Sequence, residues 1–137
     1  MDLYNLLLAK KLSGGGGGSN YDITGYMTIT NNVVINNRLV VNIPEGVVEV
    51  NSSVFNNEPI ETLILPTTLQ KAGTYSFNSL KLTSITCKAI TPPRIENNTF
   101  NNVPADCAIY VPSESVDAYK AASNWSARAA YIQAIPN

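Results

Sequence analysis

A phenylalanine followed by an asparagine recurs along this chain at a nearly constant spacing. The phenylalanines are Phe55, Phe77 and Phe100, and the steps between them are 22 and 23 residues. A period in the twenties is the signature of a solenoid, in which each repeat buries its apolar face against the next repeat. We therefore expect about three successive coils, called rungs below, that stack the three rings in a shared core.

Each phenylalanine follows a short strand pattern in which apolar and polar residues alternate. Side chains alternate across a strand, so the apolar residues should point into the core and those between them outward. The predicted inward residues are Val41, Ile43, Leu63, Leu65, Ile85, Cys87, Ile109 and Val111. The predicted outward residues, which should form a column across the stacked strands, are Asn42, Ile64, Thr86 and Tyr110.

The turns after these strands carry proline in three of the four cases. Pro44, Pro66 and Pro112 end their strands at points where a ladder donor is no longer needed. Lys88 stands at the matching position of the third strand, and Pro92-Pro93 follows later. We therefore predict a longer turn in the third repeat. We also expect the asparagines after the phenylalanines to bond to the backbone at the corners; these are Asn56, Asn78 and Asn101.

The repeats, over residues 39–108, need a cap at each end, because an open end would expose the apolar stack. Residues 20–38 alternate in the manner of strands and include the pairs Asn31-Asn32 and Asn36-Asn37, which favour tight hairpin turns. We predict an N-terminal β cap there, so that residues 20–137 form one leucine-rich-repeat-like domain.

The C-terminal part, residues 109–137, should close the other end with a helical cap. Ser113 is expected to cap a helix whose first turn is acidic. Asn124 would end that helix, and Trp125 would cover the end of the core. A further turn and a short final strand over residues 132–135 would follow.

Residues 1–12 predict a separate short helix with a broad apolar surface. The residues that we expect to dock on a partner are Leu3, Tyr4, Leu6, Leu7, Lys10 and Lys11. Eleven or twelve residues are too few to hold a helix alone in water. The alternative is that this helix packs on its own domain.

Residues 13–19 form a Gly/Ser tether that contains five consecutive glycines. Such a segment favours an anchoring helix, because ordering five glycines inside one core is entropically costly. Two other interpretations of the tether remain open, namely an engineered linker and a disordered leader.

Composition argues against catalysis and against nucleic acid as a partner. The chain has no histidine, which removes the commonest general base and metal ligand, and we expect no metal or cofactor. A net charge of −1 provides no field for nucleic acid. No apolar run reaches the roughly 20 residues of a membrane span. Cys87 and Cys107 are expected to be small buried hydrophobic residues rather than a disulfide or a reactive thiol.

Two segments carry a specific family resemblance over roughly residues 39–135. The first runs Leu63-Ile64-Leu65-Pro66 and continues to Tyr75-Ser76-Phe77, and the second begins Ile109-Tyr110-Val111-Pro112 and ends at Trp125. The first resembles the repeat of BspA-like leucine-rich-repeat proteins, and the second resembles the C-terminal cap of that family. The resemblance implies a non-enzymatic binding or scaffolding surface, on bacterial surface adhesins or on phage proteins. The first twelve residues with the glycines are similar to leaders of short phage structural proteins.

Two functions follow from these resemblances. The first is a virion-associated structural or display protein of a bacteriophage, as a decoration, fibre or baseplate component. It would assemble in the host cytoplasm, since residues 1–12 lack the pattern of a secretory signal, and residues 1–19 would dock on other virion proteins. The second is an adhesin-type module at the bacterial cell surface.

The outward column is the predicted binding face, for a host-surface protein or a glycan. Its neighbours Val40, Thr62, Ser84 and Ala108 extend it into an uncharged, partly apolar strip. Exposed apolar strips often mark contacts, and tyrosine is a frequent anchor at interfaces. The alternatives are an ordinary solvated sheet face and a face covered by a second copy in a homo-oligomer.

Overall fold

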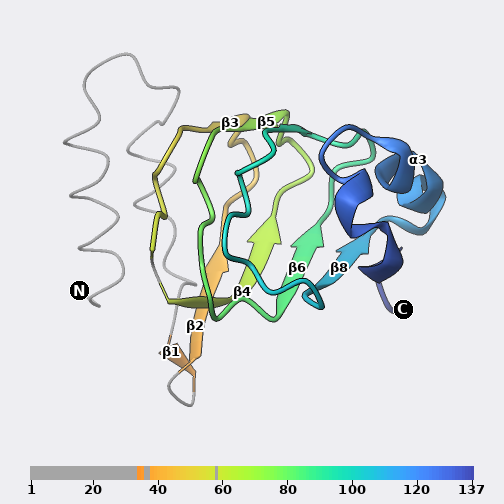
Figure 1. Cartoon of the computed structure of the whole chain (residues 1–137). Helices are drawn as coiled ribbons and strands as arrows, with labels where there is room; N and C mark the ends of the chain where they lie inside the picture. The colour runs from red at the N-terminus through yellow and green to blue at the C-terminus, as the bar shows by residue number, and fades with distance from the viewer. Residues whose placement is uncertain (1–33, 36–37, 58) are drawn as a thin grey trace.

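The computed structural model describes residues 34–35, 38–57 and 59–137. Within this part the chain winds as a series of stacked coils, with parallel strands side by side and the helical turns gathered at the C-terminal end (Figure 1). The strands are β1 (Val34–Ile35), β2 (Arg38–Asn42), β3 (Glu49–Val50), β4 (Ile60–Leu65), β5 (Lys71–Ala72), β6 (Ser84–Cys87), β7 (Arg94–Ile95), β8 (Ala108–Val111) and β9 (Ile132–Ala134). The helices are η1 (Ser113–Ser115), α3 (Val116–Ala121) and η2 (Ser126–Tyr131).

Each rung contributes one strand to a six-stranded sheet, in the order β1-β2-β4-β6-β8-β9. β1 pairs antiparallel with β2, and the other neighbours are parallel. The register places equivalent apolar residues in one row, which consists of Val41, Leu63, Ile85, Ile109 and Ile132. All of them are buried, as the alternation predicted for the first four, and Ile132 adds a fifth.

A second sheet of three short parallel strands, β3-β5-β7, lies across the core from the first (Figure 1). Leu65 is paired with Cys87 at the end of β4 and β6, whereas Lys71 is paired with Arg94 in the small sheet. The offset between the rungs therefore grows from 22 to 23 residues inside the third turn. This confirms the longer turn predicted from Lys88 and Pro92-Pro93.

The three phenylalanine rings stack in the core. Phe55 and Phe77 have ring centroids 5.6 Å apart at an interplanar angle of 13°, and Phe77 and Phe100 have centroids 5.8 Å apart at 19°. Trp125 follows with its centroid 5.6 Å from that of Phe100, but tilted by 57°. The predicted aromatic spine is confirmed, and it runs parallel to the stacking direction of the sheet.

Hydroxyl groups inside the corners join successive rungs. Ser76 Oγ lies 3.0 Å from Asn51 O of the preceding rung, and Thr99 Oγ1 lies 3.1 Å from Gly73 O of the rung before it. The fit is close, since a Cβ on Gly73 would lie 2.5 Å from Ser52 Oγ and 2.8 Å from its backbone nitrogen. Only glycine suits this point, where the backbones of two rungs approach each other.

The corner asparagines differ from the prediction. Asn78 Nδ2 donates to Asn56 Oδ1 at 2.7 Å and to Asn57 Oδ1 at 3.0 Å, so the bonds join side chains rather than side chain and backbone. In stacked coils, equivalent side-chain amides lie one strand spacing apart, so they can hydrogen-bond to each other from one rung to the next. Asn101 makes no side-chain hydrogen bond within the described residues.

The helix-capping role expected of Ser113 is wrong. η1 begins directly after Pro112, which has no side-chain acceptor, and Ser113 lies inside the helix. Ser115 precedes α3, but its hydroxyl donates to Ile90 O at 2.7 Å instead of capping. The helix ends at Ala121 rather than at Asn124, whose side chain donates to Ile95 O at 2.8 Å.

The predicted anchoring helix (1–12) and the tether (13–19) lie outside the described residues, as does nearly all of the segment 20–38. Two hairpin turns were predicted in this segment. Ile35 pairs antiparallel with Arg38, and these two residues flank the second predicted turn, at Asn36-Asn37.

Candidate binding face

The outward column predicted from the alternation is held in register by the large sheet. Asn42 is opposite Ile64, Ile64 is opposite Thr86, and Thr86 is opposite Tyr110. Gln133 on β9 continues the column beyond Tyr110. At the usual strand spacing of about 4.8 Å, the column from β2 to β9 is about 19 Å long. All five side chains are half-buried or exposed.

A second row runs beside this column on the same face. It consists of Val40, Thr62, Ser84 and Ala108, which are paired in the same order and are half-buried. The side-chain oxygens of Thr62, Ser84 and Thr86 make no hydrogen bond inside the part of the chain that the structure covers. The two rows together, called the strip below, thus offer hydroxyl, amide, aliphatic and phenol groups without a charge.

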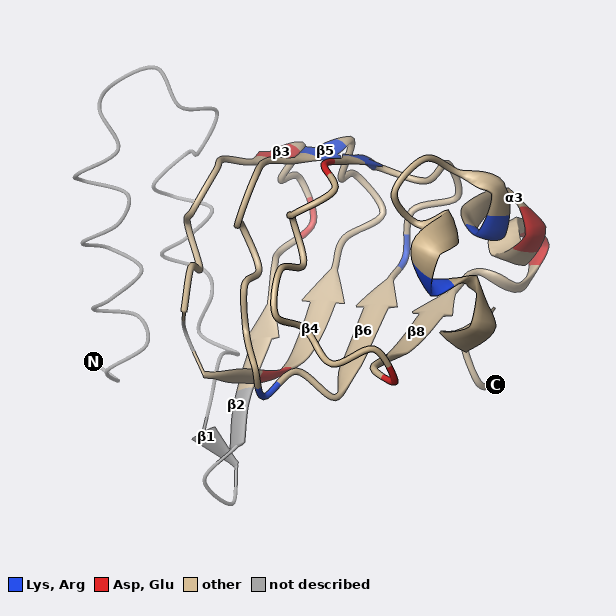
Figure 2. Ribbon diagram, in the orientation of Figure 1, with Lys and Arg blue, Asp and Glu red and all other residues tan. Residues whose placement is uncertain are grey.

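Charged side chains gather elsewhere, chiefly on the small sheet. Glu49 and Lys71 form an ion pair with Oε1 and Nζ 3.4 Å apart, and Arg94 lies next to Lys71 in register. Figure 2 shows β6 and β8 in tan, while β3 and β5 carry charged residues. The strip is therefore uncharged while the small sheet is ionic, although the large sheet also contains Arg38 on β2 and Glu61 on β4 outside the strip.

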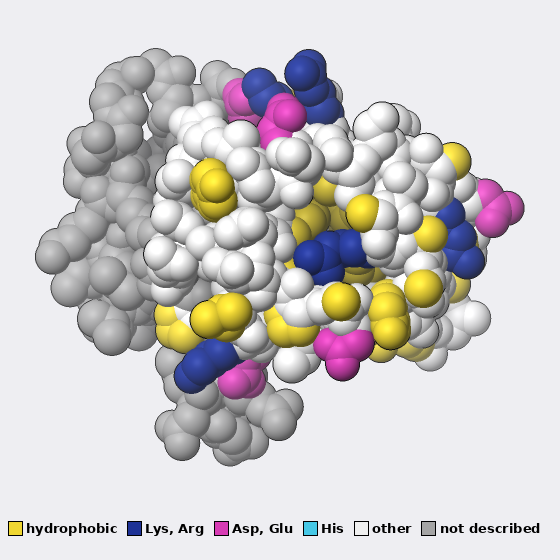
Figure 3. All heavy atoms as spheres, in the orientation of Figure 1, with side chains coloured by type: hydrophobic (Ala, Val, Ile, Leu, Met, Phe, Trp, Pro, Cys, Tyr) yellow, Lys and Arg dark blue, Asp and Glu magenta, His cyan; other side chains and the backbone are white. Residues whose placement is uncertain are grey.

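Apolar side chains on the view in Figure 3 lie among uncharged polar ones and are interrupted by charged groups. The most exposed large hydrophobic residue is Leu80, at 76%, followed by Ile90 at 54%. Isolated exposed residues of this kind are normal on a soluble surface.

The predicted docking residues of the leader lie outside the described residues. These are Leu3, Tyr4, Leu6, Leu7, Lys10 and Lys11. Their role stays a prediction, and so does the prediction that the strip binds a partner.

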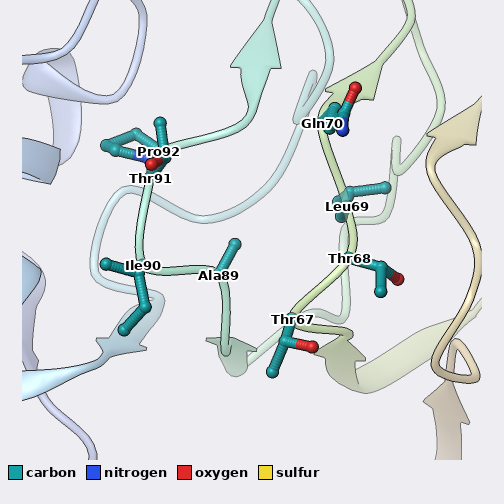
Figure 4. Close-up of a pocket in the computed structure, with 8 residues that line it drawn as sticks. All are labelled: Thr67, Thr68, Leu69, Gln70, Ala89, Ile90, Thr91 and Pro92. Atoms are coloured by element: carbon teal, nitrogen blue, oxygen red, sulfur yellow. The ribbon is translucent and has the colours of Figure 1, made fainter.

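A hollow that the sequence did not predict lies between the turns of the second and third rungs. Its volume is about 350 Å³. One wall is the segment 67–70 and the other is the segment 89–92, and Figure 4 shows the two segments facing each other. The longer third turn was the only sequence signal near it.

The buried titratable groups belong to the core. Burial raises the pKa of Cys87, whose Sγ lies 3.2 Å from the hydroxyl of Tyr119. Burial also raises the pKa of Cys107 to about 11, while the Arg128 guanidinium acts in the opposite direction. Both cysteines are free thiols and both are buried, which agrees with the prediction. Thiols with raised pKa values in an apolar core are not reactive nucleophiles.

Within the ranges that the structure describes, no group of three or more Cys, Asp or Glu residues is placed to hold a metal ion. None of the helices described there has the length and apolar character that crossing a membrane requires.

One comparison with known proteins gives a match. The family described as "BspA type leucine rich repeat region (6 copies)" matches residues 28–122. The match covers the three phenylalanines and the whole strip except Gln133, and it stops before Trp125. It begins earlier than residue 39, where the resemblance was first placed. Among curated proteins, none matches the chain.

Proposed function

Because the chain belongs to the BspA-type leucine-rich-repeat family, we propose that it is a non-enzymatic binding module whose strip contacts a partner protein. Repeats of this kind mediate protein–protein interaction. The register that aligns Ile64, Thr86 and Tyr110 on neighbouring strands carries this proposal. A row of strands packed on a stacked core is rigid, so little conformational entropy is lost when the strip binds.

We further take the domain as about three rungs between an N-terminal β cap (20–38) and a C-terminal helical cap (109–137). The C-terminal assignment is supported by Trp125, which is 1% exposed and lies against Phe100. Its indole N–H donates to Pro93 O at 2.8 Å, which ties the helical segment to the third rung.

Binding through the strip is tested with the double variant Ile64→Lys and Thr86→Lys. Purified, fluorescently labelled protein is mixed with cells of the bacterial strain in which the gene occurs, and bound label is measured by flow cytometry. Two lysines on a neutral face should weaken binding at least tenfold, because a buried unpaired ammonium is costly. The control is Asn97→Lys, an exposed position away from both the strip and the hollow. Equal binding by the double variant and by the control would contradict the assignment.

The finer proposal is that the module is displayed on a bacteriophage particle, with residues 1–19 as its attachment. The leucine-rich leader and the five glycines support this arrangement, since a docking helix and a tether suit ends that belong to different partners. The test is deletion of residues 1–19 followed by immunoblotting of purified particles. Particles that still carry the shortened protein would exclude the leader as the attachment.

The second candidate is an adhesin-type module at the bacterial cell surface, which the family match favours equally. The two candidates differ in where the protein is found. Immunogold labelling of intact cells and of purified particles separates them, because only a particle protein co-sediments with virions and only an adhesin labels uninfected cells.

A further inference from the structure

Polar links join the turns of the first and second rungs. The carboxylate of Glu45 accepts from the backbone N–H of Thr67 at 2.8 Å and also from its hydroxyl. Thr68 Oγ1 accepts from the N–H of Gly46 at 2.9 Å and donates to the carbonyl of Val47 at 2.8 Å. One hydroxyl thus satisfies both a donor and an acceptor of the preceding turn.

The next pair of turns lacks the atoms for these links. Ala89 and Ile90 stand 22 residues after Thr67 and Thr68, and neither side chain contains oxygen. Thr67 stands where Glu45 stood, and its hydroxyl is engaged with that carboxylate. In the first two turns a backbone N–H donates to the carbonyl three residues earlier, from Val47 to Pro44 and from Leu69 to Pro66. Within the described residues, the N–H of Thr91 makes no such bond to Lys88.

Three backbone groups are left without a hydrogen bond inside the described ranges. They are the N–H groups of Thr68 and Ala89 and the carbonyl of Leu69. Their counterparts in the preceding repeat, at Gly46, Thr67 and Val47, all point into the gap between rungs one and two. The second turn makes the same backbone turn bond as the first, so the N–H of Thr68 and the carbonyl of Leu69 keep the orientation of their counterparts and point into the gap between rungs two and three. Ala89 follows β6, which is still in register with β4 at Cys87, so its N–H faces the same gap.

That gap is the hollow of about 350 Å³. Figure 4 shows Ala89 on the wall opposite Leu69, and Ile90 directed away from the wall that carries Thr68. Ile90 therefore does not fill the space that a threonine hydroxyl takes in the preceding gap. The volume lies within the range of small-ligand sites, which is about 300–1,000 Å³.

We propose that this hollow binds a single residue of a neutral saccharide. A sugar hydroxyl can accept from Thr68 N–H and donate to Leu69 O, as the Thr68 hydroxyl does for Gly46 and Val47. A second hydroxyl can accept from Ala89 N–H, in place of the Glu45 carboxylate. Every side chain that lines the hollow is uncharged, which favours a neutral sugar over a charged one. The methyl group of Ala89, which points into the space between the two segments in Figure 4, adds apolar surface for the C–H groups of the ring.

This site is separate from the strip, and the inference does not depend on the proposed function. The test is a two-dimensional amide NMR titration of the full chain with methyl α-glucopyranoside, methyl β-galactopyranoside and N-acetylglucosamine. At least one should shift amides of residues 67–70 and 89–92. N-acetylneuraminic acid should give shifts at least tenfold weaker at equal concentration. Acetyl-threonine amide, which carries the same hydroxyl on a peptide, is the probe for a protein ligand.

Two variants fill the site from opposite walls. Thr91→Trp and Gln70→Trp each place an indole on an exposed wall residue, and each should block the hollow. Both should weaken binding at least tenfold, whereas Leu80→Trp, at a position 76% exposed, should leave it unchanged. The amide spectra themselves show whether each variant is folded.

The proposal is overturned if no saccharide shifts these amides, if folded Thr91→Trp or Gln70→Trp binds as well as the parent, or if acetyl-threonine amide binds more tightly than every sugar. The strip variant Ile64→Lys and Thr86→Lys should bind sugar normally. A loss of cell binding with intact sugar binding would therefore separate the two surfaces.

Discussion

The hydroxyl of Tyr119 donates a hydrogen bond of 2.7 Å to the backbone carbonyl of Ala89, which lies 30 residues earlier in the chain. Both residues are buried, and the same hydroxyl lies 3.2 Å from Cys87 Sγ. The tyrosine ring also meets Trp125 edge to face, with centroids 5.0 Å apart. A residue of the C-terminal helix thus fixes one wall of the hollow from the inside.

Removing this hydroxyl should destabilise the domain. Tyr119→Phe leaves the Ala89 carbonyl buried without its donor, which costs about 1–3 kcal/mol in the free energy of unfolding. Urea denaturation followed by tryptophan fluorescence measures it. Tyr131→Phe makes the same chemical change at a position 41% exposed and should stay within about 0.5 kcal/mol of the parent. Equal effects of the two variants would refute this role of Tyr119.

Alkaline pH should also weaken the fold. Burial raises the pKa of Cys107 from 9.0 to about 11, and it raises the pKa of Cys87 and of Tyr119 as well. Between pH 9 and 11 the unfolded chain loses these protons while the folded chain keeps them, so the unfolded state binds fewer protons. Stability is then complete below pH 9 and falls as the pH rises.

The measurement is the thermal midpoint from pH 7 to pH 11. Cys107→Ala should reduce the decline above pH 9, because the titrating thiol is absent. A midpoint that stays constant to pH 11 in the parent would contradict the burial of these groups.

The middle ring of the aromatic spine should matter most for stability. Phe77 is fully buried and stacks on both Phe55 and Phe100. Phe77→Ala should lower the free energy of unfolding by about 3–5 kcal/mol, the usual cost of emptying an aromatic core site. Leu80→Ala, three residues away on the surface, should change it by less than about 0.5 kcal/mol. A loss below about 1 kcal/mol at Phe77 would argue against the stacked core.

The guanidinium of Arg128 should not be replaceable by lysine. Its Nη1 donates to Pro104 O at 3.0 Å, and its Nη2 donates to Val103 O at 3.1 Å and to Phe100 O at 3.3 Å. A lysine ammonium cannot reproduce this planar fork. Arg128→Lys should cost about 1–3 kcal/mol and speed hydrogen exchange at the Val103 and Cys107 amides.

Arg94→Lys is the matched control, because the Arg94 side chain is 76% exposed. It should leave both stability and exchange near the parent values. If Arg128→Lys behaves like this control, the three carbonyl contacts contribute nothing measurable.

The period and the alternation were sufficient to predict the spine and the outward column. Both follow from spacing alone, since a repeat of 22 residues places Phe55 over Phe77 and Ile64 beside Thr86. The cap at Ser113 and the bonds of the corner asparagines were predicted wrongly. Pro112 sets where η1 begins, and the neighbouring rung supplies the partner of Asn78, so both depend on contacts that local propensity does not contain.

The hollow could not be predicted, because it forms where Ala89 and Ile90 lack the side-chain oxygens that join the preceding pair of turns. Lys88 and the later prolines signalled a longer turn, but the spacing did not show that Ile90 would point away from Thr68. The role of residues 1–12 rests on sequence alone.

The tilt of Trp125 against Phe100 also bears on self-assembly. A column of parallel rings presents a flat face at its end, onto which another molecule could dock and so prolong the column into a filament. In this chain the turned indole, 57° from the ring before it, ends the parallel stacking, and Tyr119 packs edge to face against it so that only 1% of it is exposed. A second molecule therefore finds no bare ring at this end of the column.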